Sequence, residues 1–254
     1  MRTILDDIIA NKRIEINHMK SRFTYKDFEN EAFFKRNVIS LADSLRSKDF
    51  GVIAELKRKS PSAGEIQPDL NLNEKVKAYE LFQAAGISIL MDNKFFGGLT
   101  EDMKTVRSLT NLPLLFKEFV IDEFQLFEAK AIGADAVLLI SEVLTKQQIL
   151  HFSIIAKSLG LEVLLELHSK EQLEKINDEV DIIGINNRNL NIQQTDLQTS
   201  FDLIDYLPKN KVLISESGIK TQLEMEQLKA VGFQGALIGE SLLKSQLDLS
   251  FQRI

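Results

Sequence analysis

Eight short apolar runs recur between residue 52 and residue 239, and this repeat restricts the possible folds more than any other feature of the sequence. Each run is apolar and β-branched, which is typical of a parallel strand that is covered on both faces. Longer segments with the helical spacing of apolar residues separate the runs, among them 72–85, 101–109, 145–159 and 221–231. The runs lie at residues 52–57, 87–91, 114–117, 136–140, 162–167, 182–186, 212–215 and 236–239.

Alternating strands and helices predict an α/β fold with a parallel sheet. Two topologies fit this order, a closed (β/α)8 TIM barrel and an open doubly wound sheet. Eight units in about 200 residues favour the closed barrel, and the absence of a G-x-G-x-x-G pattern after the first run weakens the dinucleotide-binding alternative. Glycines are expected just past the ends of several of the helices. The glycines concerned are Gly86, Gly133, Gly160 and Gly232.

Residues 1–45 precede the first run and are predicted to form an N-terminal helical extension. Their mixed charges favour a helix packed on the core over a helix on a membrane surface. The apolar residues at helical spacing are Ile4, Ile8, Ile9 and Ile16, and the charged residues between them include Lys12. No linker rich in Pro, Gly or Ser divides the chain, so residues 1–254 are interpreted as a single domain.

The composition excludes several classes of site and partner. The chain has no cysteine, which rules out disulfides, thiolate metal sites and a cysteine nucleophile. A net charge of −6 argues against a nucleic-acid partner. No apolar run approaches the roughly 20 residues of a membrane span, and the first residues lack the apolar centre of a secretory signal. We therefore expect a cytoplasmic protein without a membrane partner, and the three histidines lack metal-binding spacing.

The active site of a (β/α)8 barrel lies at the carboxyl ends of the strands, so the polar residues there are the candidates. Glu55 and Lys57 are two residues apart and share one face of their strand. An inward pair at the barrel mouth avoids the cost of charge in a sealed core. The alternative is an ion pair that faces outward into the helical shell. Ser60 belongs to the hydroxyl-rich turn that follows.

Lys117 ends the third apolar run and Glu166 lies near the end of the fifth. A neighbouring cation would lower the pKa of Lys117 into the range of a general acid, whereas the alternative is an ordinary surface lysine. Glu166 lies between two leucines, so strand alternation places it on the opposite face from them. His168 follows directly, and a lone histidine at a strand end is more often structural than catalytic.

The last three runs end in residues suited to holding polar groups of a ligand. Asn186 donates and accepts hydrogen bonds without a charge, and Arg188 is suited to pairing with an acid. The alternative for this segment is an asparagine-rich turn. The loops after the seventh and eighth strands, each beside a helix start, are the usual phosphate site of such barrels. The candidate phosphate-binding residues are Gly218, Gly239, Glu240 and Ser241.

Seven motifs, which together span nearly the whole chain, resemble those of the indole-3-glycerol phosphate synthase family and occur in the family's order. The motifs are IAELKRKSPSAG (53–64), LMDNKFFGG (90–98), LLFKEFVID (114–122), LLELH (164–168), IGINNRNL (183–190), ISESGI (214–219) and LIGESLL (237–243). The resemblance implies a carboxy-lyase of tryptophan biosynthesis that needs no cofactor and no metal. Its reaction is the ring closure, decarboxylation and dehydration of 1-(2-carboxyphenylamino)-1-deoxyribulose 5-phosphate. The expected partner is this phosphorylated small molecule, and the expected state is a monomer, with other pathway enzymes as candidate partners.

The resemblance also implies roles for individual residues. Lys117 matches the general acid that protonates the substrate carbonyl, and Glu166 matches the acid and base for the later loss of water. Lys57 matches the lysine that contacts the substrate carboxylate. The remaining matches are Glu55 and Asn186, which hold the substrate and the catalytic lysines; Glu216 and Ser217, further active-site residues; Phe96 and Phe119 of the anthranilate pocket; and Gly218, Gly239 and Ser241 of the phosphate site.

Four positions depart from the commonest family pattern: Met91, Asn93, Phe95 and Ala63 stand where Thr, an acid, Tyr and Lys are frequent. Three rival interpretations remain. Phosphoribosylanthranilate isomerase is a similar barrel, but by resemblance it uses a cysteine that this chain lacks. The tryptophan synthase α subunit is a second phosphate-binding barrel. The third rival is a catalytically silent barrel that binds a phosphorylated metabolite for regulation.

Overall fold

The computed structural model describes residues 3–61, 64–190 and 192–239. Within these residues, eight parallel strands close into a barrel in chain order, and the last strand pairs with the first. The predicted closed barrel is therefore confirmed, and no strand boundary differs from its prediction by more than one residue. The strands are β1 (Gly51–Leu56), β4 (Gly86–Leu90), β5 (Leu114–Lys117), β6 (Ala136–Ile140), β7 (Glu162–Leu167), β8 (Ile182–Asn186), β9 (Val212–Glu216) and β10 (Gly235–Ile238).

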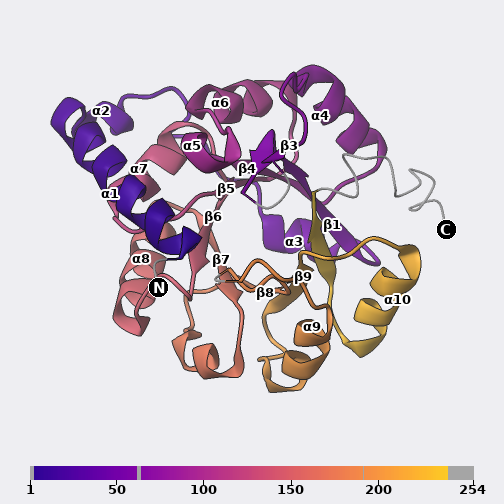
Figure 1. Cartoon of the computed structure of the whole chain (residues 1–254). Coiled ribbons are helices and arrows are strands. Elements are labelled where there is room, and N and C mark those ends of the chain that lie inside the picture. Colours follow the sequence, from indigo (N-terminus) through magenta and orange to yellow (C-terminus); the bar gives the residue numbers. More distant parts are fainter. Residues whose placement is uncertain (1–2, 62–63, 191, 240–254) are drawn as a thin grey trace.

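Helices surround the strands, and short elements decorate the loops between them (Figure 1). The outer helices are α4 (Leu72–Leu81), α6 (Thr100–Leu109), α7 (Phe124–Ala131), α8 (Lys146–Ser158), α9 (Gln198–Leu203) and α10 (Gln222–Val231). The loop elements are β2 (Lys59–Ser60), β3 (Gly64–Glu65), α5 (Asn93–Phe96), η1 (Lys170–Lys175) and η2 (Ile204–Tyr206). Strands β2 and β3 pair antiparallel in the loop after β1.

Three of the four glycines predicted to follow helices have the left-handed backbone of that position. Gly133, Gly160 and Gly232 have φ of 98°, 76° and 114°. The prediction for Gly86 is wrong, because Gly86 lies inside β4 and Gln83, with φ of 59°, takes the left-handed position after α4.

Gly86 instead makes room for the helix that closes the amino-terminal end of the barrel. Helix α3 (Leu41–Arg46) packs there against β1, β4 and β9, and its Leu41 and Leu45 are fully buried. A Cβ on Gly86 would lie 2.6 Å from a methyl carbon of Leu41, and a Cβ on Gly51 would lie 2.8 Å from Leu45. These leucines continue the apolar filling of the barrel, which leaves only the opposite end open for a site.

The rest of the extension consists of α1 (Ile4–Arg22) and α2 (Tyr25–Glu29), and residues 31–40 form turns rather than a helix. Thr3 begins α1 with a capping box, in which its side chain accepts a hydrogen bond from the Asp6 backbone. The buried side of α1 includes Lys12, which is 4% exposed and so does not lie on the polar face as its charge predicted.

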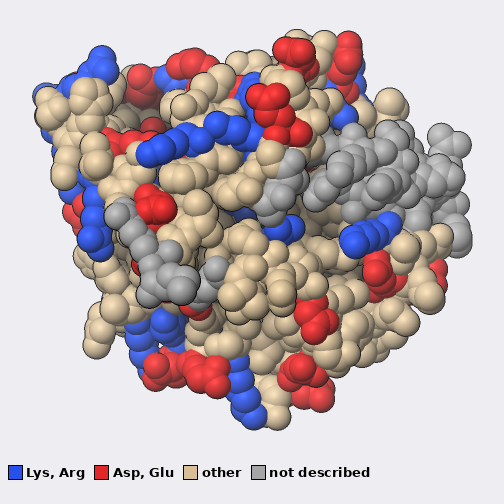
Figure 2. Space-filling view, in the orientation of Figure 1, with Lys and Arg blue, Asp and Glu red and all other residues tan. Residues whose placement is uncertain are grey.

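Charges of both signs are mixed on the face of the molecule that Figure 2 shows. Figure 2 shows basic and acidic side chains interspersed over the face of Figure 1, without a large area of one sign. Among the described residues no helix is long and apolar enough to cross a membrane.

Candidate active site

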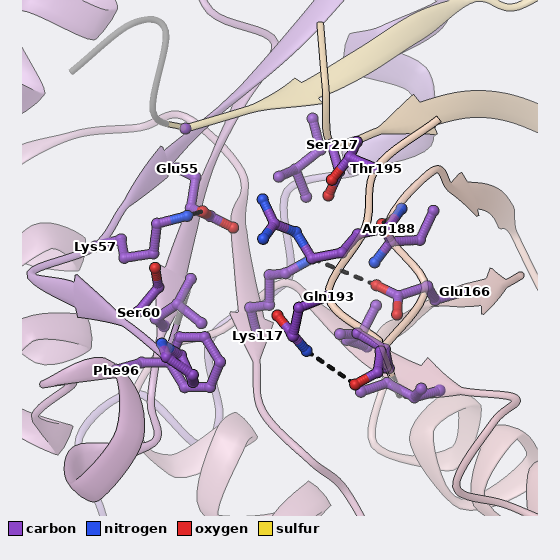
Figure 3. Close-up of a pocket in the computed structure, with 18 of the residues that line it drawn as sticks. Glu55, Lys57, Ser60, Phe96, Lys117, Glu166, Arg188, Gln193, Thr195 and Ser217 are labelled. Atoms are coloured by element: carbon purple, nitrogen blue, oxygen red, sulfur yellow. Dashed lines mark hydrogen bonds and ion pairs between the residues drawn. The ribbon is translucent and has the colours of Figure 1, made fainter. Parts of the chain in front are cut away.

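A cavity of about 570 Å³ opens at the carboxyl ends of the barrel strands, where the sequence predicted the site. Residues from β1, β5, β7 and β8 and from the loops after β4, β8, β9 and β10 meet there (Figure 3). The predicted residues that line it are Glu55, Lys57, Ser60, Phe96, Lys117, Phe119, Glu166, Asn186, Arg188, Ser217, Gly218 and Gly239. Side chains far apart in the sequence therefore face one space.

Glu55 and Lys57 form an inward ion pair, with 2.6 Å from Lys57 Nζ to Glu55 Oε1. The outward alternative is excluded, because both residues line the cavity. Burial would raise the pKa of Glu55, but Lys57 and Lys117 together lower it below its ordinary value. A Cβ on Gly239 would lie 2.6 Å from Glu55 Oε1, so the glycine after β10 leaves room for this carboxylate.

Lys117 lies between two buried carboxylates. Its Nζ is 2.8 Å from Glu216 Oε2 and 3.5 Å from Glu166 Oε2. Burial alone would lower the pKa of Lys117, but Glu216, Glu166 and Glu55 raise it above its ordinary value. The expectation of a lowered pKa is therefore wrong, because the nearest charges are anions and the charge of Lys57 is paired with Glu55. The raised pKa favours the ammonium form of Lys117.

Glu166 and Glu216 differ in pKa although both contact Lys117. Burial opposes ionisation of Glu166, but Lys117, His168 and Asn186 outweigh it and lower the pKa to about 2. Burial and the charge of Glu166 raise the pKa of Glu216 to about 7, against the opposing effect of Lys117. Glu166 is thus the carboxylate that is ready to accept a proton.

Glu216 does not line the cavity but supports Lys117 from behind it. Its carboxylate fits because Gly184 on β8 has no side chain, since a Cβ there would lie 2.1 Å from Glu216 Oε1. Glu216 was predicted from its motif, whereas the need for a glycine at position 184 was not predicted.

The loop after β9 turns through two consecutive left-handed residues, Ser217 with φ of 67° and Gly218 with φ of 81°. A left-handed backbone is unusual for serine, and such conformations cluster at functional sites. Gly218 and Gly239 line the same cavity as the basic residues Arg188 and Lys220, which suits an anion. The predicted phosphate-binding residues Glu240 and Ser241 lie outside the described residues.

Apolar side chains of the N-terminal extension cover part of the cavity, a role that was not predicted from the sequence. Ile4, Leu5 and Ile8 of α1 line the cavity, although their spacing predicted only a helix packed on the core. Residues of the loop after β8 also line it, namely Leu190, Gln193, Thr195 and Leu197. The ring centres of Phe96 and Phe119 are 6.0 Å apart, which gives the wall an aromatic patch.

Three of the four departures from the family pattern lie within the described residues, and none of these three lines the cavity. Met91 is buried, and the Asn93 side chain donates a hydrogen bond to the Gly98 carbonyl over 3.1 Å. The Phe95 ring packs beneath the Lys94 ammonium. Ala63 lies outside the described residues. Within the described ranges no three acidic or histidine side chains are grouped so as to hold a metal ion.

Comparisons with known proteins find one family over nearly the whole chain. The family model for "Indole-3-glycerol phosphate synthase" matches residues 5–253. A protein of that name from Bacteroides thetaiotaomicron is 45% identical over 248 residues, which cover 96% of this chain and 94% of the relative. A protein of the same name from Caldanaerobacter subterraneus subsp. tengcongensis is 40% identical over 242 residues, covering 95% of this chain and 93% of the relative.

Solved structures support the fold independently. A mutant tryptophan synthase α-subunit from Pyrococcus furiosus superposes with a TM-score of 0.59 at 19% identity, covering 78% of this chain and 91% of that chain. At this identity the likeness concerns the barrel alone.

Proposed function

This chain belongs to the indole-3-glycerol phosphate synthase family, and on that premise we propose which of its residues bind and convert the substrate. The chain is a carboxy-lyase of tryptophan biosynthesis. Its reaction closes the ring of 1-(2-carboxyphenylamino)-1-deoxyribulose 5-phosphate and yields indole-3-glycerol phosphate, carbon dioxide and water. The position of Lys117 between Glu166 and Glu216 is the observation that carries the assignment of roles.

The substrate lies across the cavity with its two ends in chemically different places. Its phosphate binds in the loops after β9 and β10, at Gly218 and Gly239, with Ser217 beside them. Its anthranilate ring lies against Phe96 and Phe119, and Lys57 binds the ring carboxylate. The basic residues that line the cavity support the first end, and the aromatic contact supports the second.

Ring closure uses Lys117 as the proton donor. The aromatic carbon that bears the carboxylate attacks the ketone carbon, and the π electrons of the carbonyl move to its oxygen. The Lys117 ammonium gives that oxygen a proton, which removes the developing charge. Carbon dioxide then leaves, and the electrons of the broken bond restore the aromatic ring. Substrate held in a folded conformation gains further rate from proximity.

Dehydration uses Glu166 as the proton acceptor. The hydroxyl leaves as water with a proton from Lys57, and the neighbouring methylene carbon gives its proton to Glu166. Its lowered pKa keeps Glu166 ionised at neutral pH and therefore free to accept a proton, and the position of Glu166 in the cavity wall supports this role. Glu55 holds Lys57, and Asn186 holds Glu166. The remaining polar groups, Ser60 and Arg188, bind the substrate chain.

The test of the function is an assay of the purified chain with the carboxyphenylamino substrate. We expect one indole product, detected by its fluorescence, for each carbon dioxide released, without added metal or cofactor. Binding of phosphate ligands without formation of indole would instead favour the silent-barrel alternative.

We also propose a cytoplasmic monomer. The absence of cysteine fits a reducing compartment, and a single chain supplies every residue assigned above. Sedimentation of the purified chain tests the oligomeric state.

A further inference from the structure

The two oxygens of the Glu166 carboxylate face two different basic side chains. Glu166 Oε2 is 3.5 Å from Lys117 Nζ, on the side of the cavity. Glu166 Oε1 is 3.2 Å from Nε2 of His168, a residue that does not line the cavity. Glu166 and His168 are two residues apart at the end of β7, so strand alternation points both to the same side. Because His168 is not among the residues that line the cavity, its ring contacts Glu166 without forming part of the wall that faces the substrate.

The His168 ring is buried and has few neighbours that could form hydrogen bonds with its nitrogens. Its side chain is 8% exposed, and among the described residues neither ring nitrogen makes a hydrogen bond of good geometry. The acidic groups with the largest electrostatic effect on it are Glu166 on its own strand, Glu142 after β6 and Glu216 on β9, while Lys117 lies on the other side of Glu166. All three are carboxyl groups. A buried imidazole in such surroundings is suited to carrying a positive charge.

The backbone at His168 is fixed independently of the ring. Its N–H donates to Gln172 Oε1 over 2.7 Å, and the Ser141 hydroxyl donates to the same oxygen over 2.5 Å. Gln172 belongs to η1, so this element anchors the carboxyl end of β7. The backbone contacts therefore position the ring near Glu166 without a hydrogen bond from the ring itself.

We propose that His168 is a positioning residue for Glu166, holding one carboxylate oxygen so that the other faces Lys117 and the substrate. This inference rests on the function proposed above, because it assigns His168 a part in the same reaction. Burial would lower the pKa of His168, but Glu166, Glu142 and Glu216 raise it above its ordinary value, which supports a charged contact. A charged donor at this distance fixes the carboxylate more strongly than a neutral one does.

Histidine NMR gives a test that does not depend on activity. The chain has only three histidines, His18, His151 and His168, so each ring signal can be assigned by single substitution. We expect Glu166→Gln to move the titration of His168 to lower pH, because the imidazolium loses its nearest carboxylate. A His168 titration that is unaffected by this substitution would overturn the proposal.

Kinetics supply the second test, with a matched histidine as the control. We expect His168→Ala to lower kcat about 10- to 100-fold with little change in KM, because a small displacement of Glu166 costs rate rather than binding. His168→Gln restores part of kcat, since its amide can still donate to Oε1. His151→Ala leaves kcat unchanged, although His151 lies 3.0 Å from the exposed Glu123.

The outcomes separate the positioning role from the function itself. If the wild-type chain makes no indole product, the proposed function is wrong. An active wild type, together with His168→Ala of unchanged kcat and pH profile, removes only the role of His168. If His168→Ala does not fold in a thermal melt, then His168→Leu decides, because a side chain that cannot hold Glu166 Oε1 but leaves kcat and the pH profile at their wild-type values contradicts the proposal.

Discussion

Lys12 and Glu118 form a buried ion pair, with 2.9 Å from Nζ to Oε2, that joins helix α1 to the residue next to Lys117. The same ammonium is 3.0 Å from Asp92, which follows β4. Asp92 in turn accepts a hydrogen bond from the Phe95 backbone at the start of α5. One lysine on the extension therefore ties together two strand ends of the active-site rim.

Lys12→Met should destabilise the fold by about 3–5 kcal/mol, because it leaves Asp92 and Glu118 buried without their cation. The loss is measured as the free energy of unfolding in guanidinium chloride. The matched control is Lys20→Met, at a lysine on the same helix as Lys12. This substitution removes an exposed ion pair of 2.6 Å with Asp122 and should cost no more than about 1 kcal/mol. Equal small losses in both variants would show that the buried ion pair stabilises the fold no more than the exposed one does.

Glu118 should make stability depend on pH. Burial raises its pKa to about 7 in the folded chain, with Asp92 adding to this and Lys12 opposing it, from an ordinary value of 4.5. The folded chain then binds this proton more tightly than the unfolded chain, so the group's contribution to stability falls as pH rises from about 4.5 to about 7. Glu118→Gln cannot titrate, so its unfolding free energy relative to wild type should rise across that window by about 3 kcal/mol at most. A constant difference would contradict the raised pKa.

The barrel could be predicted from the sequence because each strand and helix is determined by the pattern of apolar residues within its own segment. A short apolar run between two helical segments forms a buried parallel strand in most surroundings, so the strand bounds were accurate to one residue. Gly86 shows the limit of this reasoning. A glycine after a helical pattern fits a helix end, but Gly86 begins β4, and the close approach of the distant Leu41 explains why a glycine is needed there.

The sequence was enough to predict that the charged residues lie at the rim of the barrel, but not to predict which of them form ion pairs. Strand alternation predicted that Glu55 and Lys57 face inward, and they do. The pKa of Lys117 depends on which charges from β7 and β9 come within a few ångströms, and no local pattern contains that information. The burial of Lys12 was missed for the same reason, since its partners lie about 80 and 106 residues away.

Lys117→Ala should abolish turnover, with kcat reduced about 10²- to 10⁴-fold, because the developing alkoxide loses its proton donor. Binding of an unreactive substrate analogue, measured by calorimetry, should weaken only modestly. Lys146→Ala is the control, since Lys146 is exposed and 3.9 Å from the exposed Glu174. Near-normal kcat in the Lys117 variant would refute the assignment of the acid.

Glu166→Gln should reduce kcat about 10²- to 10⁴-fold while the chain remains folded, because the amide keeps the shape of the carboxylate but cannot accept the proton. Product formation and a thermal melt are measured on the same preparation. A melting temperature that collapses together with activity would mean that Glu166 has a structural role rather than a chemical one.

Gly184→Ala should impair catalysis through a residue that does not touch the substrate. The new methyl group would lie 2.1 Å from Glu216 Oε1, so the Glu216 carboxylate must move and take with it the ion pair to Lys117. A displacement of this kind at the proton donor costs up to about 100-fold in kcat. Lys117 then also loses one of the anions that keep it charged.

The control for Gly184 is Gly160→Ala, at a helix end with a left-handed backbone and only the Lys130 ammonium within 4 Å. That variant should lose about 1 kcal/mol of stability, because alanine is strained there, and should keep its kcat. The two glycines therefore separate a steric effect on the site from a general loss of stability. Equal kcat in both variants would mean that Glu216 can move without disturbing Lys117, and the support of Lys117 from β9 would then have no part in the reaction.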